Sequence, residues 1–321
     1  MGILYAGFIV FILLLLALDL GVFNRTAHVI KVPEALKWSA MWISIGVAFS
    51  GFVYAGYENH WFGLGVGAHA SDGYEAVGSY LTGFVVEKAL AVDNIFVIAM
   101  LFTMLKVPPL HQHRVLFWGI VGALLMRGAM IAVGAALIAK FTWILYVFGG
   151  FLVLTGVKML FSHDDNDPKD SFIVRTVRRI LPVTNEFHGG QFFVRLSNGA
   201  RRGTPLLLAL VLVELSDVLF AVDSIPAVFA VTTDPFLVFT SNVFAILGLR
   251  SLFFALAGMM ERFKYLGTAL AFVLIVIGVK MLAHHWLHGL LGEHFNLYML
   301  AVVALILGIG VTASLRATKE T

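Results

Sequence analysis

The chain has 321 residues, of which 60% are hydrophobic and only 13% are charged, with a formal net charge of +3. Ordinary globular domains carry about 25% charged residues, so a water-soluble globular protein is excluded. The sequence contains no cysteine, which excludes disulfides, thiolate metal sites and thiol redox chemistry.

Apolar runs bounded by polar residues recur along the whole chain. Runs of about 20 residues cross roughly 30 Å of hydrocarbon, so the sequence predicts an all-α, polytopic membrane protein. The expected fold has about nine transmembrane helices. Their approximate limits are 3–23, 38–57, 78–105, 115–138, 142–161, 204–230, 236–258, 264–283 and 295–315. Pro226 lacks a backbone donor and predicts a bend in the sixth span.

The Lys and Arg residues between the spans predict the orientation of the chain. With nine spans, all of them except Lys140 fall on one side of the membrane. Short cytoplasmic loops are the ones enriched in Lys and Arg. We therefore expect the N-terminus outside and the C-terminus in the cytoplasm. The 162–203 segment is then a cytoplasmic linker loop, with a regulatory or partner-binding role as the alternative.

An acidic segment of the third span recurs in the sixth. Residues 87–95 read EKALAVDNI and residues 217–225 read DVLFAVDSI, and GVKML occurs at both 156–160 and 278–282. The first copy runs from outside to inside and the second from inside to outside. The sequence thus predicts two inverted three-helix repeats, 78–161 and 204–283. Inverted repeats are a common plan of secondary transporters, whose sites lie near the membrane midplane.

This repeat divides the chain into five parts. Two N-terminal helices (1–77) precede the first repeat, and the last helix with its cytoplasmic tail (284–321) follows the second. The linker loop joins the repeats. The alternative is an ancient duplication whose matched polar residues only hold helices together.

Charged side chains fall inside the predicted spans. Each costs roughly 2.5–3.5 kcal/mol at a helix centre, so they are expected to face the interior, paired or hydrated. They are Asp19, Glu87, Lys88, Asp93, Arg127, Lys158, Glu214, Asp217, Asp223, Arg250 and Lys280. Lys158 and Lys280 lie near helix ends and are expected to reach the interface.

Carboxylate, amide and hydroxyl oxygens suit hard or borderline divalent cations. The candidate metal ligands are Asp93, Asp223, Asp217, Glu214, Glu87, Asn94 and Ser224. The candidate counter-ion or gating residues are Arg127, Arg250 and Lys88. Neutralisation of Glu87 by Lys88 or an Arg is the alternative for that carboxylate.

The spacing of the acids limits this site. Residues six apart, such as Glu87 and Asp93, point about 120° from each other on an ideal helix. Either a helix breaks near Asn94 or at residues 224–226, or one carboxylate of each pair coordinates while the other relays protons. Asp93 is expected to face Asp223.

Residues 213–227 (VELSDVLFAVDSIPA) resemble the signature of the TerC family, and residues 86–96 (VEKALAVDNIF) match its first copy. Residues 229–236 (FAVTTDPF) make the chain similar to the Alx branch of that family. The resemblance implies a bacterial inner-membrane protein associated with manganese export. The functional acids that it implies are Glu87, Asp93, Glu214, Asp217 and Asp223. Members of the family also carry tellurium-resistance and redox-modulator labels.

We therefore expect a secondary transporter, and not an enzyme, that exports Mn²⁺ from the cytoplasm to the periplasm by alternating access. The chain has no nucleotide-binding motif, so protons or the membrane potential are the expected drive. No permanently bound cofactor and no nucleic-acid partner are expected; the partners are Mn²⁺, protons and the lipid bilayer. The alternative is a membrane scaffold or stress-response component without transport activity.

Overall fold

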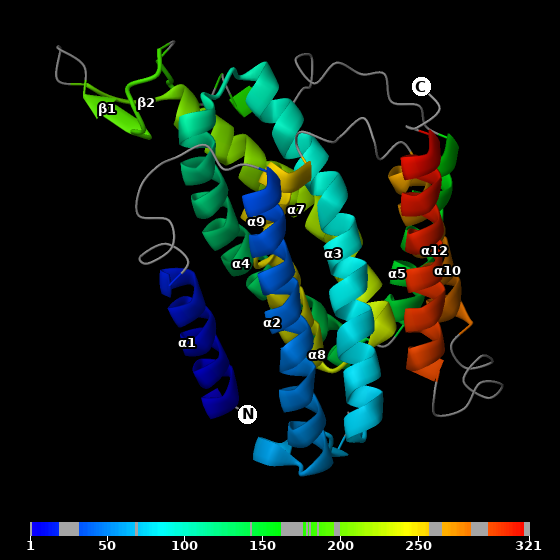
Figure 1. Ribbon diagram of the computed structural model, residues 1–321. Helices are drawn as coiled ribbons and strands as arrows, with labels where there is room; N and C mark the ends of the chain where they lie inside the picture. Colours follow the sequence, from blue (N-terminus) through cyan, green and yellow to red (C-terminus); the bar gives the residue numbers. More distant parts are fainter. Residues whose placement is uncertain are drawn as a thin grey trace.

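The computed structural model describes residues 2–18, 32–67, 70–141, 143–161, 176–177, 179, 181–184, 186–195, 200–256, 265–283 and 295–317. This part of the chain is a helical bundle with one small hairpin (Figure 1). The helices are α1 (Gly2–Leu18), α2 (Val32–Glu58), η2 (Trp61–Gly63), α3 (Gly73–Met104), α4 (Pro109–Lys140), α5 (Ile144–Phe161), α7 (Pro205–Val231), α8 (Pro235–Ile246), α9 (Leu249–Leu256), α10 (Leu266–Leu282) and α12 (Phe295–Ala317). The strands are β1 (Phe193–Arg195) and β2 (Arg201–Gly203).

Each predicted span overlaps at least one described helix, but the number of spans remains a prediction. Five of the described helices are long and apolar enough to cross a membrane, or six if α8 and α9 count as one bent span. Helices α1 and α10 are apolar but have only 17 residues each. Helix α3 has 32 residues and carries Glu87, Lys88 and Asp93 in its middle. Asp19 lies outside the described residues.

Two carboxylates fix the starts of helices that surround the centre of the bundle. The Asp72 side chain accepts from the Glu75 amide at 2.8 Å and caps α3. The Asp234 side chain accepts from the Phe236 amide at 2.8 Å and caps α8, while the Tyr57 hydroxyl donates to Asp234 at 2.7 Å. Such caps satisfy amides that the first helical turn leaves without partners.

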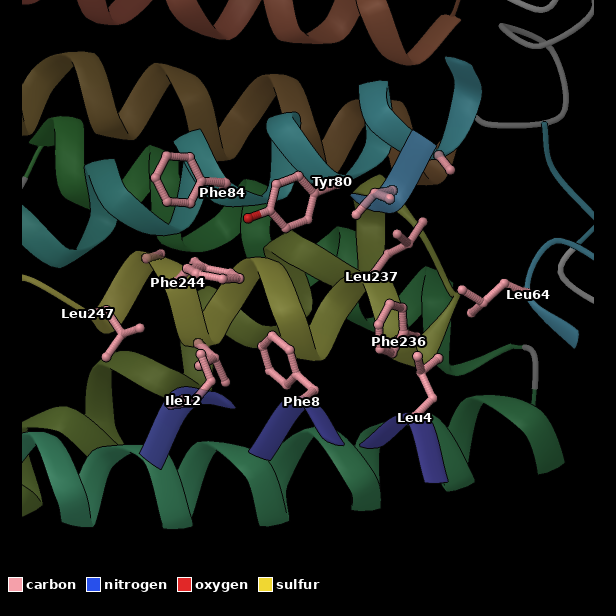
Figure 2. Packing of buried hydrophobic residues seen from close by; sticks show 14 of the residues in the cluster. Leu4, Phe8, Ile12, Leu64, Tyr80, Phe84, Phe236, Leu237, Phe244 and Leu247 are labelled. Atoms are coloured by element: carbon pink, nitrogen blue, oxygen red, sulfur yellow. The ribbon is translucent and has the colours of Figure 1, made fainter. Parts of the chain in front are cut away.

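An aromatic core packs α1 and α2 against α3 and α8. Figure 2 shows Phe8 of α1 pointing at Phe236 and Phe244 of α8. The ring centroids of Phe8 and Phe244 are 5.8 Å apart, and those of Phe49 and Phe244 are 4.7 Å apart. Aromatic pairs at these distances add to the dispersion attraction that holds helices together where lipid removes the hydrophobic driving force.

Helices α5 and α10 approach each other closely through small residues. A methyl group on Gly156 would lie 2.7 Å from the Ala271 carbonyl oxygen, and one on Gly278 would lie 2.8 Å from the Gly149 carbonyl oxygen. Small residues at such positions let two membrane helices approach backbone to backbone. The repeated GVKML segment therefore supplies one half of each contact.

Neither of the helix breaks offered as one alternative, near Asn94 or at residues 224–226, is present in the described helices, and the bend at Pro226 stays a prediction. Helix α7 continues through Pro226 to Val231, and α3 is continuous at Asn94. A bend lies between α8 and α9, which meet at 43°. Gly248 there has φ +79°, and a methyl group on it would lie 2.6 Å from the Trp42 Cβ. A proline removes one hydrogen bond from a helix, whereas a residue in the left-handed conformation ends the helix.

The linker loop is partly structured. Strands β1 and β2 pair antiparallel, which adds a small sheet to the predicted all-α fold. The Arg114 guanidinium at the start of α4 lies 5.2 Å from the Phe192 ring centroid, and Phe192 and Val183 pack on the buried cluster that includes Leu206 of α7. The described part of the linker is thus folded onto one end of the bundle. Figure 1 shows that end to be the one where α12 finishes.

Candidate cation site

Arg127 of α4 lies at the centre of a buried polar cluster between α3, α4 and α7. Its Nε donates to Asp217 Oδ2 at 3.1 Å and its Nη2 to Asp217 Oδ1 at 2.8 Å. Its Nη1 forms an ion pair with Glu87 and donates to the Ser224 hydroxyl at 3.2 Å. One guanidinium therefore bridges an acid from α3 and an acid from α7, with the two-pronged geometry that favours Arg over Lys.

Each acid also accepts a hydrogen bond from the helix that carries the other acid. The Asn94 amide of α3 donates to Asp217 Oδ1 at 2.9 Å, and the Ser224 hydroxyl of α7 donates to Glu87 Oε1 at 3.3 Å. Each donor stands seven residues after the acid on its own helix, so acid and donor point within about 20° of each other. Seven-residue spacing, and not the six-residue spacing of the carboxylates, brings these side chains together without a helix break.

A sixth polar residue joins this cluster from α8. The Asn242 amide donates to Glu87 Oε2 at 3.1 Å, and Asn242 is 1% exposed. The Oδ1 atoms of both Asn242 and Asn94 are buried without a hydrogen-bond partner. A buried acceptor without a partner costs about 1–3 kcal/mol. The cluster therefore has oxygen atoms available for coordination beyond those that it uses internally.

The whole cluster is shielded from solvent. Glu87 is 0%, Arg127 2% and Asp217 4% exposed. Two buried carboxylates share one guanidinium here, so this group of three side chains carries one net negative charge when all are ionised. Uncompensated charge in a low-dielectric interior is costly, so the remaining negative charge requires a further positive group nearby, either a side chain such as Arg250 or a bound cation.

A small cavity lies against the cluster. It has a volume of about 30 Å³ and its wall includes Asn94, Asp217 and Arg250. One water needs roughly 10–15 Å³ by this measure, so the cavity holds at most an ion or a couple of waters. Arg250 of α9 is 5% exposed and thus contributes a second guanidinium to the surroundings of the acids.

Lys88 is held by backbone carbonyl oxygens, and its counter-ion or gating role stays a prediction. Its ammonium donates to the carbonyl oxygens of Ala245 at 2.9 Å and Leu247 at 3.0 Å, at the end of α8. Lys280 of α10 is likewise buried, and it donates to the Ala230 carbonyl of α7 at 2.7 Å. Cations are stabilised at helix C-termini because the last carbonyls lack partners. Lys280 is therefore buried against the end of α7, and its position relative to the membrane interface stays a prediction.

Glu214 and Asp223 have contacts with residues other than Arg127. Glu214 is partly buried against Gly122 of α4. Its carboxylate fills the space that a side chain at position 122 would occupy, and its Oε2 has no hydrogen-bond partner. Asp223 accepts a hydrogen bond from Thr155 of α5 and lies near Lys158. Asp93 is on α3, but its side chain lies outside the described residues, and so does its expected pairing with Asp223.

Carboxylates alone do not build a metal site in the described part of the chain. No group of three or more His, Asp or Glu side chains there has the geometry to hold an ion. Any cation at Glu87 and Asp217 would need the neutral oxygens of Asn94, Ser224 and Asn242 as well. Asn242 is not among the residues predicted from the sequence; its only signal there is a polar triplet, residues 240–242, inside an apolar span.

Comparisons with known proteins agree on the class of molecule. A family model described as "Integral membrane protein TerC family" matches residues 72–321. An uncharacterized membrane protein of Myxococcus xanthus is 52% identical over 279 residues, covering 87% of this chain and 82% of the relative. The "Putative membrane-bound redox modulator Alx" of Escherichia coli (strain K12) is 46% identical over 287 residues, covering 89% of this chain and 87% of the relative. No solved structure matches the chain.

Proposed function

Because the chain belongs to the TerC family of multi-pass integral membrane proteins, we propose that it is a secondary transporter that exports divalent manganese from cytoplasm to periplasm. Glu87 and Asp217 bind the ion, and Asn94 and Ser224 contribute neutral oxygen ligands. The protein resides in the bacterial inner membrane with its N-terminus periplasmic and its C-terminus cytoplasmic. Protons or the membrane potential drive the transport.

The observation that carries this proposal is the position of Arg127. A single guanidinium holds Glu87 and Asp217, one from each acidic copy, in a buried site. A divalent cation bound there would replace the guanidinium as the counter-charge. Arg127 is then a tethered cation that stabilises the empty site and leaves the acids when the ion arrives. Oxygen ligands suit Mn²⁺, Mg²⁺ and Ca²⁺ alike; manganese is chosen because of the resemblance to the Alx branch.

Two sets of contacts support inverted repeats around this site. Asn94 of the first copy donates to Asp217 of the second, and Ser224 of the second donates to Glu87 of the first. In the α5–α10 contact, Gly149 and Ala271 each stand seven residues before the glycine of a GVKML segment, and each contacts the other segment. Such exchange of partners is expected from a two-fold axis in the membrane plane.

A second cavity supports a route from the cytoplasmic side. It measures about 390 Å³, lies beside the α3–α4 turn, and has Lys106, Gln112 and Phe253 in its wall. Phe253 of α9 also lines the small cavity at Asp217, and its ring packs on that of Phe102 with centroids 5.4 Å apart. Phe253 therefore borders both cavities, and a continuous route between them would require the Phe102–Phe253 pair to move, as a movement of α9 about its break would allow.

The test is Mn²⁺ uptake by inside-out membrane vesicles, in which export accumulates the ion inside. We expect Glu87→Gln and Asp217→Asn to reduce uptake to the level of vesicles that lack the protein. Asp234→Asn is the matched control, because Asp234 is a buried carboxylate that caps α8 and asparagine also caps helices. Uptake at the wild-type level in both site variants would overturn the assignment of the site.

A second candidate function follows from the printed name of the Escherichia coli relative, a putative redox modulator. In this reading the chain is a stress-response component of the membrane without transport activity, and the buried charges serve assembly. Purified protein in liposomes separates the two candidates. Mn²⁺ movement by the purified protein alone favours transport, whereas its absence alongside a stress phenotype in cells favours the second candidate.

A further inference from the structure

We propose that Asn242 is a direct ligand of the transported cation, which gives the site a neutral amide oxygen from α8 beside the carboxylates of α3 and α7. This inference rests on the proposed function and deepens it. The substrate that it specifies is a divalent cation that accepts mixed carboxylate and amide oxygen coordination.

Three observations place Asn242 at the site. It is 1% exposed, its Nδ2 donates to Glu87 Oε2 at 3.1 Å, and its Oδ1 has no hydrogen-bond partner. A buried carbonyl oxygen beside a carboxylate suits a hard cation, because the cation then satisfies both oxygens at once. If Asn242 only had to hold Glu87, its donor would suffice and the oxygen would normally find a partner.

The backbone around Asn242 is held in place by the same segment of α3 that supplies Glu87. The next residue, Lys88, donates to the carbonyl oxygens of Ala245 and Leu247, which follow Asn242 by three and five positions. Glu87 and Lys88, which are consecutive on α3, therefore hold α8 at two places: the Asn242 amide and the carbonyls at the end of the helix. Ligands held by such supporting contacts lose little freedom on binding an ion.

An exchange of partners connects the two states of this site. With Arg127 on the acids, the Asn242 amide presents its nitrogen to Glu87 as a donor. When a cation takes the place of the guanidinium, a half-turn of the amide presents Oδ1 to the ion instead. The terminal torsion of asparagine has two broad wells of this kind. Asn94 has the same arrangement toward Asp217, so both amides can change from donor to ligand.

The test compares Asn242→Asp and Asn242→Leu in the full-length purified protein, with Asn59→Asp at the exposed end of α2 as the matched control. Mn²⁺ affinity is measured by calorimetry, and the rise in Tm on adding Mn²⁺ is measured alongside. A ligand role predicts that the leucine variant binds at least tenfold more weakly. The aspartate variant keeps an oxygen ligand, so it retains the affinity or strengthens it.

The aspartate variant also separates a ligand from a mere donor. Without metal, the introduced carboxylate would repel Glu87, so Asn242→Asp should have a lower Tm than wild type and a larger rise with Mn²⁺. A variant that folds only in the presence of Mn²⁺ gives the same support. If the aspartate variant binds as weakly as the leucine variant, or if both bind as wild type does, the proposal is overturned.

Failure of the proposed function gives a different pattern. In that case the wild-type protein itself shows neither Mn²⁺ binding nor a Mn²⁺-dependent rise in Tm, and Asn242 has no transported cation to bind. If wild type binds and transports Mn²⁺ while both Asn242 variants behave as wild type, the transport function stands and only the role of Asn242 is lost.

Discussion

Arg127 shows how much a single buried side chain determines in this protein. Its guanidinium donates to both oxygens of Asp217 and pairs with Glu87, so it holds together helices that belong to different acidic copies. Replacing one member of a buried ion pair typically costs about 3–5 kcal/mol, because the other charges remain buried without compensation. The stability of the metal-free state should therefore depend on this one residue.

Arg127→Met tests whether the stability of the metal-free protein depends on this guanidinium. We expect the variant to lose about 3–5 kcal/mol of stability without metal, because Glu87 and Asp217 then face each other uncompensated. Added Mn²⁺ should restore more stability than it gives wild type, since no guanidinium competes with the ion. Thermal unfolding with and without Mn²⁺ measures both effects. Arg316→Gln, an exposed position on α12, is the control; equal Mn²⁺ responses in Arg127→Met and wild type would contradict the exchange.

The charged residues inside the spans could be recognised from the sequence, but their partners could not. Charge inside an apolar run is conspicuous because burying it is expensive, which is why Glu87, Asp217 and Arg127 could be selected. Asn242 is neutral and gives no such signal. The partners of Asp223 and Lys88 depend on which neighbouring helix each side chain faces, and a single sequence does not contain that information.

The break between α8 and α9 shows what hydropathy does not reveal about a single apolar run. The apolar run 236–258 predicts one helix, because its composition is uniform on both sides of Gly248. The left-handed φ of Gly248 and its contact with Trp42 divide the run. Glycine is common in membrane helices, so its presence alone does not mark a break. Pro226 is the more obvious signal, yet α7 remains helical there.

Gly248→Ala should destabilise the protein, and the same change at Gly150 should not. Alanine at a positive φ costs about 1–2 kcal/mol, and its methyl group would collide with Trp42. A methyl group on Gly150 of α5 would meet no atom within 4 Å, so alanine there should leave stability unchanged or raise it slightly. Chemical unfolding of the two variants measures the difference. A Gly248→Ala variant as stable as wild type would argue against a fixed bend.

The orientation of the whole molecule in the membrane is predicted from its basic residues. With nine spans, the basic residues outside the spans, apart from Lys140, are predicted to collect on one side, and exposed Arg195, Arg201 and Arg202 of β1 and β2 belong to the described part of that side. The positive-inside rule predicts that this end of the bundle faces the cytoplasm. Helix positions followed from hydropathy, whereas the close contact of α5 with α10 depends on tertiary packing of glycines that are distant in sequence.

Single cysteines test the orientation cleanly because the chain has none of its own. We expect Arg201→Cys to react with a membrane-impermeant maleimide only in inside-out vesicles or after permeabilisation. Lys140→Cys, at the end of α4, should react in intact spheroplasts. The reverse pattern would invert the orientation. Labelling of both positions from one side would contradict the single predicted span, 142–161, that separates Lys140 from the linker.

Counterflow of Mn²⁺ in liposomes that contain only the purified protein tests the central claim most directly. Vesicles loaded with unlabelled Mn²⁺ should take up labelled Mn²⁺ through the wild-type protein, and excess Mn²⁺ inside should be required for this uptake. Asp217→Asn should abolish the exchange, whereas Asp234→Asn should retain it. Exchange by Asp217→Asn at the wild-type rate would contradict a cation site shared by Glu87, Asp217 and Arg127.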